Sequence, residues 1–106
     1  MRMSKRLVFL EKMIAEGSTD PFALYGLAME YRTLERCEEA LSTFQLLRQR
    51  QPSYVAMYLM CGQMLDQMGR KEEAREWISV GIEQAQMQKN GHALSELQAA
   101  LATIHG

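Results

Sequence analysis

Residues 24–44 read LYGLAMEYRTLERCEEALSTF, and residues 58–78 read YLMCGQMLDQMGRKEEAREWI. The two stretches align with a shift of 34 positions, so that Leu24 falls on Tyr58 and Ala28 on Gly62. A polar turn and the triplet Glu-Glu-Ala also coincide. Agreement in residue size and polarity along the whole stretch indicates a tandem repeat. A repeat at a fixed period is the sequence signature of repeat folds.

Both repeats carry the spacing of helices. Their apolar residues recur every three or four positions, which is typical of amphipathic helices. The chain is rich in Ala, Leu, Met, Glu and Gln, which favour helix, and it lacks runs of Val, Ile and Thr. These patterns predict an all-α fold with helices at residues 4–16, 21–33, 37–50, 54–68, 71–87 and 92–104.

Local signals mark where the helices begin and end. Asp20 is expected to cap the second helix, and Ser53 is expected to cap the fourth. Gly69 suits a left-handed position between the two helices of the second repeat. Asp66 and Arg70 have the i,i+4 spacing of an ion pair that supports a helix by a few tenths of a kcal/mol, roughly.

Small residues predict close contact between the two helices of each repeat. Ala28 and Gly62 should face Ala40 and Ala74, so that the backbones approach closely. Gly62 within a helix costs about 1 kcal/mol in helix propensity relative to alanine. Close packing is the expected compensation.

These residues resemble the tetratricopeptide repeat family, in particular its small bacterial members. The family's 34-residue unit has apolar, aromatic, small and proline residues at set places. The matching residues here are Leu24, Leu27, Ala28, Tyr31, Ala40, Phe44 and Pro52 in the first unit, and Tyr58, Gly62, Gly69 and Ala74 in the second. The chain departs from the pattern at several places, among them Glu35 for the turn glycine and Gly81 for an alanine.

The resemblance implies a right-handed alpha-alpha superhelix, or solenoid, within a single domain covering residues 1–106. Its two helix-turn-helix repeats would span 21–53 and 54–88. Stacked repeats expose apolar ends, so the helices at 4–16 and 92–104 are expected to cap them. The apolar stripe of the last helix could be such a cap or a dimerising seam, and its residues are Leu94, Leu97, Leu101 and Ile104.

Charge and composition argue against several function classes. The net charge is −1, and acidic and basic residues are interleaved, whereas a nucleic-acid-binding face needs clustered Lys and Arg. The chain has no glycine-rich phosphate loop and no matched set of metal ligands. Cys61 occupies a repeat position that faces the core. We therefore expect no enzyme activity, no catalytic residue, no metal and no cofactor.

The sequence also predicts a cytoplasmic protein that does not span a membrane. No secretory signal precedes Cys37 and Cys61, because the apolar stretch 7–10 is too short and is followed by Glu11. No segment approaches the roughly 18 apolar residues that a membrane span requires. The two thiols are expected to stay reduced.

The family resemblance implies a protein-interaction module, since the first helix of each unit lines a concave groove that receives a peptide or partner domain. The implied groove residues are Phe22, Tyr25, Met29 and Arg32 in the first unit, and Leu59, Met60, Gln63, Asp66 and Gln67 in the second. Tyr25 and Met29 fit a groove or the core equally well.

Two details refine the interaction hypothesis. Some family members grip a C-terminal carboxylate with asparagines, and Met29 and Gln63 stand at those places here, so a clamp of that kind is not expected. The alternative function is a self-associating assembly protein, a homodimer held through terminal helices with Leu97 and Leu101 in the contact.

Overall fold

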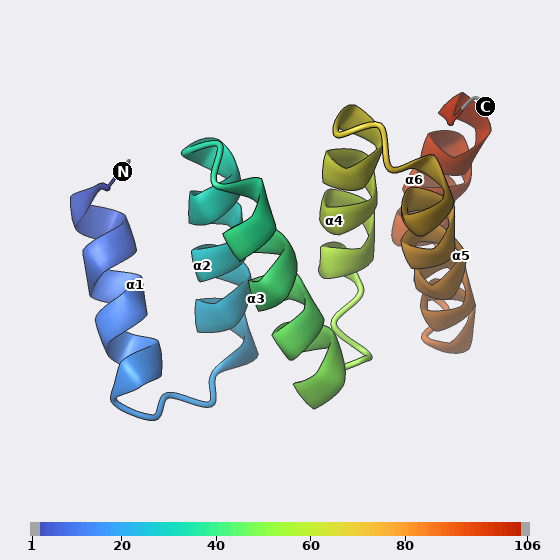
Figure 1. Ribbon diagram of the computed structural model, residues 1–106. Coiled ribbons are helices and arrows are strands. Elements are labelled where there is room, and N and C mark those ends of the chain that lie inside the picture. Colours follow the sequence, from blue (N-terminus) through green and yellow to red (C-terminus); the bar gives the residue numbers. More distant parts are fainter. Residues whose placement is uncertain (1–2, 105–106) are drawn as a thin grey trace. The chain divides into compact units, whose positions relative to one another are not determined.

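The computed structural model describes residues 3–104, and this part of the chain contains helices and turns but no strand (Figure 1). Contacts divide the chain into two compact units, Met1–Pro52 and Ser53–Gly106. The helices of the first unit are α1 (Lys5–Ala15), α2 (Pro21–Thr33) and α3 (Cys37–Arg50). Those of the second are α4 (Ala56–Gln67), α5 (Lys71–Met87) and α6 (Gly91–Thr103). The all-α prediction is confirmed.

The observed helices begin and end within two residues of the predicted positions. The largest difference is at the start of α4, which begins at Ala56. The expected cap by Ser53 is wrong, because Val55 is the residue that precedes the helix and its apolar side chain makes no capping hydrogen bond.

Other helix ends follow from local chemistry as expected. The Asp20 carboxylate accepts a hydrogen bond of 3.0 Å from the backbone N–H of Phe22. Gly69 ends the turn between α4 and α5 with a φ of +79°, which glycine adopts without steric cost. The equivalent turn between α2 and α3 places Glu35 at a φ of +60°, where a side chain is disfavoured.

In the first unit, α2 packs against α3 on one side and α1 on the other (Figure 1). Ala28 of α2 and Ala40 of α3 are fully buried, as their predicted place between the two helices requires. Phe44 is also completely buried and adds apolar contact to this core. Leu7 and Leu10 are the buried residues of α1.

In the second unit, α4 packs against α5, and α6 contacts both. A Cβ atom on Gly62 would lie 2.5 Å from Ile78 Cγ1 and 3.5 Å from the carbonyl oxygen of Ala74. The predicted close approach at Gly62 is thus confirmed. The ring of Tyr58 lies 5.9 Å, centroid to centroid, from that of Trp77.

Gly81 marks a second close approach, which the sequence reasoning did not foresee. A Cβ atom there would lie 2.6 Å from Tyr58 Cβ and 2.9 Å from Leu97 Cδ2. Leu97 of α6 is only 1% exposed. Leu97 therefore fills the core of its own unit, and it is not available for the alternative dimer seam that sequence analysis considered along α6.

The predicted ion pair between Asp66 and Arg70 is replaced by two others. Because α4 ends at Gln67, the i,i+4 geometry of a continuous helix does not extend to Arg70. Lys71 Nζ lies 2.5 Å from Asp66 Oδ1, and Arg70 Nε lies 2.6 Å from Glu73 Oε2.

Candidate functional site

The acidic, histidine and cysteine side chains of the described residues are dispersed. Within residues 3–104, no three His, Cys, Asp or Glu side chains gather where a metal ion could be held. Cys37 and Cys61 are free thiols, and Cys61 is buried. None of the described helices is long and apolar enough to cross a membrane.

The first candidate surface runs along α2. Phe22, Tyr25, Met29 and Arg32 follow one another at spacings of three or four residues, so they form one stripe on the helix. We call these four residues the α2 stripe. Phe22 is 66% exposed, and the other three are half-buried. The opposite side of α2 supplies the buried residues of the unit.

The polar groups of the α2 stripe lie close enough to affect one another. Burial raises the pKa of Tyr25, and the positive charge of Arg32 opposes that shift. Tyr25 therefore keeps its phenolic proton at neutral pH, and the stripe combines an exposed phenyl ring, a thioether, a phenol and a guanidinium.

The second candidate surface runs along α4 in the other unit. Gln63 and Gln67 are exposed, while Leu59, Met60 and Asp66 are half-buried. We call these five residues the α4 stripe. Asp66 is held by Lys71 from the start of α5. This stripe is more polar than the α2 stripe, since two amides are its most exposed groups.

Sequence reasoning missed a third feature, a hollow between α1 and α2 within the first unit. Its volume is about 270 Å³, and its lining residues are Arg6, Phe9, Leu10, Met13, Asp20, Phe22, Ala23 and Gly26. Phe9 is 63% exposed. The signal was in the sequence, because Val8 and Phe9 fall outside the spacing of Leu7 and Leu10 and so cannot share their buried face.

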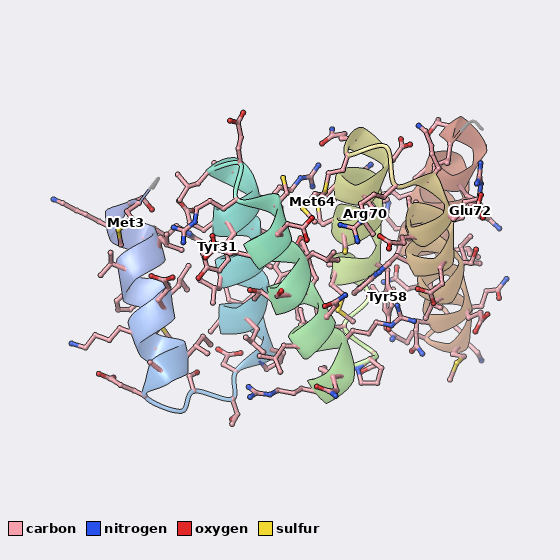
Figure 2. All side chains as sticks on the ribbon, viewed as in Figure 1. Met3, Tyr31, Tyr58, Met64, Arg70 and Glu72 are labelled. Carbon is pink, nitrogen blue, oxygen red and sulfur yellow. The ribbon has the colours of Figure 1, made fainter. Side chains whose placement is uncertain are left out.

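Polar contacts fix α1 against α2 beside this hollow. The Ser4 hydroxyl donates to Glu30 Oε1 at 2.9 Å, and Arg6 Nε lies 3.4 Å from Glu30 Oε2. Tyr31, labelled in Figure 2, donates its phenolic hydrogen to Glu11 Oε2 at 2.5 Å. These contacts set the orientation of the hollow's two walls.

The environment of Tyr31 strongly raises the pKa of its phenol. Burial and the hydrogen bond to Glu11 together raise the pKa of Tyr31 to about 12. Arg36 stacks over the same ring, with its guanidinium carbon 4.9 Å from the ring centroid. Arg36 also donates to both oxygens of Glu39, at 2.7 and 2.6 Å, and this lowers the pKa of that carboxyl.

Comparison with known proteins places these surfaces in a family. The chain matches no family model and no curated protein. It does match a tetratricopeptide repeat domain protein from Salinibacter ruber, of which a crystal structure is known. The two chains are 33% identical with a TM-score of 0.76, and the match covers 82% of this chain and 98% of the other. This chain belongs to the tetratricopeptide repeat family.

Two further structures agree. The solution structure of the Salinibacter ruber domain gives the same identity and TM-score, with 80% of this chain and 86% of the other covered. A protein from Bordetella parapertussis shares the fold at 24% identity, with a TM-score of 0.82 and coverage of 96% and 89%. The tetratricopeptide repeat fold is in general a protein-interaction fold. The small residues of this chain that matched the repeat pattern are Ala28, Ala40, Gly62 and Ala74.

Proposed function

We propose that this tetratricopeptide repeat protein is an adaptor that binds another protein through two surfaces, the α2 stripe of the first unit and the α4 stripe of the second. The observation that supports this most is Phe22, which is 66% exposed on a helix whose other apolar side chains are buried or half-buried. An exposed aromatic beside half-buried methionine and tyrosine side chains provides adaptable apolar contact.

The polar members of the stripes would give such contact its specificity. Arg32 and Tyr25 offer hydrogen-bond donors at one end of the α2 stripe, and the amides of Gln63 and Gln67 offer donors and acceptors on the α4 stripe. A peptide that presents apolar side chains at intervals and satisfies these groups with its backbone would fit both kinds of surface. No catalytic step is needed for this role, and we propose none.

The test is capture of the partner from the lysate of the native cells. The bait is the full chain, compared with a double variant, Phe22→Ser with Gln63→Ala, and with the control Met87→Ser. Met87 is 75% exposed on α5 and lies on neither stripe. The proposal predicts that a protein held by the wild type and by the control is lost with the double variant.

Stability has to be measured alongside. Because Phe22 and Gln63 are exposed, their substitution should leave the melting temperature nearly unchanged. A captured protein that the double variant retains would contradict the proposal. So would loss of that protein with the Met87 control.

We also propose that the partner is a protein rather than a nucleic acid. The net charge of −1 gives no excess of cations to neutralise phosphates. The test is a heparin column. Elution at low salt is expected, and retention at moderate salt would contradict this part of the proposal.

Two structural roles and a location complete the proposal. We infer that α1 and α6 act as caps on the repeats against which they pack, because Leu7 and Leu97 are almost fully buried in those contacts. We further propose a cytoplasmic location, where the free thiols of Cys37 and Cys61 would remain reduced. Fractionation of the native cells with an antibody against the chain tests the location, and recovery outside the cytoplasm would contradict it.

A further inference from the structure

The outward face of α1 is unusually apolar for an exposed helix surface. Val8 is 49% exposed and Phe9 is 63% exposed. Phe22 stands across the hollow on α2, and we call Val8, Phe9, Met13 and Phe22, together with the hollow they border, the α1 patch. Exposed apolar side chains that gather around a hollow mark an interaction site more often than scattered single residues do.

The floor of the hollow is open because Gly26 has no side chain there. A Cβ atom on Gly26 would lie 3.5 Å from Arg6 Nη2 and 3.7 Å from Leu10 Cδ2. The hollow, about 270 Å³ in volume, can accept a large apolar side chain from outside. A phenylalanine that resembles Phe9 itself has a suitable shape.

Charges stand at opposite ends of this patch. Lys5 and Arg6 occupy the first turn of α1, while Glu16 is its C-cap residue and Asp20 follows in the next turn. Lys12 lies near the second end but is 3.9 Å from Glu16, so it partly offsets one acidic group. The patch is thus basic at one end, apolar in the middle and acidic at the other.

This order of charges opposes the helix dipole. Cations near a helix N-terminus and anions near its C-terminus each cost a few tenths of a kcal/mol up to about 1 kcal/mol. The same chain follows the favourable order elsewhere, since α3 has acidic residues in its first turn and basic residues in its last. Lys12, in the last turn of α1, follows the favourable order, but Lys5, Arg6 and Glu16 do not, so these three charges do not stabilise α1 through its dipole.

We propose that the α1 patch binds a second copy of this chain, with the two α1 helices antiparallel across a two-fold axis. In that arrangement residue 5 of one copy faces residue 16 of the other, and the pairing occurs twice. The basic end of each helix then meets the acidic end of its counterpart. The axis passes near residues 10 and 11, which places Phe9 of each copy against the Met13 side of the other copy's hollow.

A second copy satisfies both ends of the patch, and other occupants do not. A membrane surface with anionic lipids would attract Lys5 but repel Glu16 and Asp20, and Arg6 already pairs with Glu30 of its own unit. An acidic peptide would meet the same conflict. The inference differs from the dimer predicted from sequence, because the contact lies on α1 rather than at Leu97. Phe22 takes part in this contact and in the proposed peptide contact, so the two would compete for that residue, and the tests below use the chain without any partner.

The first test is sedimentation of the purified full chain, without any partner, from about 1 µM to about 1 mM at low salt. A reversible monomer–dimer equilibrium is expected. Phe9→Ala should raise the dissociation constant at least about tenfold, as loss of a central interface aromatic does, whereas Met87→Ala should leave it unchanged. A wild type that stays monomeric at about 1 mM overturns the proposal, as does an equal effect of the two substitutions.

The second test exchanges the charges. Lys5→Glu and Glu16→Lys each place like charges in contact twice, so each variant alone should dimerise several-fold more weakly, by roughly three- to tenfold. An equimolar mixture should form a heterodimer about as tight as the wild-type dimer, because both contacts are again opposite in sign.

Unfolding cannot explain that result. Each substitution puts the charge that the dipole of α1 favours at its own end. The pair of Glu16 with Lys12, which Glu16→Lys removes, is exposed and worth little, so the thermal stability of the monomer should change little. A mixture no tighter than the separate variants overturns the antiparallel arrangement. Binding to vesicles of anionic lipid by a chain that stays monomeric would overturn self-association in favour of a membrane contact. Failure to capture another protein from lysate would leave these sizing results unaffected.

Discussion

Two glycines inside helices predict opposite effects of the same substitution. A Cβ on Gly81 would lie 2.6 Å from Tyr58 Cβ, while one on Gly26 would meet nothing nearer than 3.5 Å. Gly81→Ala should therefore destabilise the protein by about 1–3 kcal/mol through overpacking. Gly26→Ala should stabilise it by about 1 kcal/mol through helix propensity. Urea unfolding measures both, and equal effects of the two substitutions would contradict the packing described at Gly81.

The two interhelical turns allow a test of backbone strain. Gly69 has a φ of +79°, and Glu35 has a φ of +60° in the equivalent turn. Gly69→Ala should cost about 1 kcal/mol, because a left-handed φ disfavours a side chain and no neighbour is near enough to clash. Glu35→Gly should gain up to about 1 kcal/mol for the same reason. Thermal unfolding checks both, and a destabilised Glu35→Gly would show that the contacts of Glu35 outweigh the strain.

At the residue scale, the sequence predicted those caps and turns that depend only on residues nearby in the chain. The Asp20 cap and the left-handed Gly69 follow from residues within one turn of each. The pairing of Asp66 with Lys71 could not be predicted in this way, because it depends on where α4 ends. Ser53 was misassigned for a similar reason, since the chain continues through Val55 before α4 begins.

At the scale of elements, the contact between α1 and α2 should depend on alkaline pH. Tyr31 donates to Glu11, and its pKa is raised to about 12 from an ordinary value of 10.0. The unfolded chain therefore releases this proton more readily than the folded chain, so stability present below pH 10 is lost as pH rises toward 12. Tyr31→Phe should remove that part of the pH dependence.

The measurement is urea unfolding of wild type and Tyr31→Phe at several values between pH 9 and 12. Lysine and other groups titrate in both proteins, so the difference between the two isolates Tyr31. The stability difference should shrink steadily across that interval. A difference that does not change with pH would contradict the raised pKa.

The contact between α4 and α5 rests on small residues. Ala74 is fully buried, and its carbonyl oxygen lies within reach of the Cβ position of Gly62. Ala74→Leu should therefore destabilise the protein by at least about 1–3 kcal/mol. Calorimetry would show the effect as a lower melting temperature. A variant that melts like the wild type would mean that the two repeats have been aligned wrongly.

Elements could be predicted better than surfaces. The period of the apolar residues fixes six helices to within two residues, because a helix is a local structure with a strong repeating signal. For α1, the same period does not say which apolar residues are buried or which helix buries them. Leu7 and Leu10 pack against α2, while Phe9 remains exposed. That outcome depends on how the two helices meet, which the spacing alone does not state.

At the scale of the whole molecule, family membership follows from 33% identity over most of a known tetratricopeptide repeat domain. The sequence could predict this because the repeat constrains many positions twice. It could not name the partner, since the residues of the α2 and α4 stripes lie outside the buried core and are not fixed by its packing. We therefore propose that the stripes determine which partner is bound, while the repeats determine the fold.

The most direct test is a map of backbone amide shifts in the NMR spectrum of the labelled chain as a captured partner segment is added. The binding proposal predicts that the largest changes belong to amides around Phe22, Tyr25, Gln63 and Gln67, on α2 and α4. Changes confined to the outer faces of α3 and α5, with those amides unmoved, would contradict it.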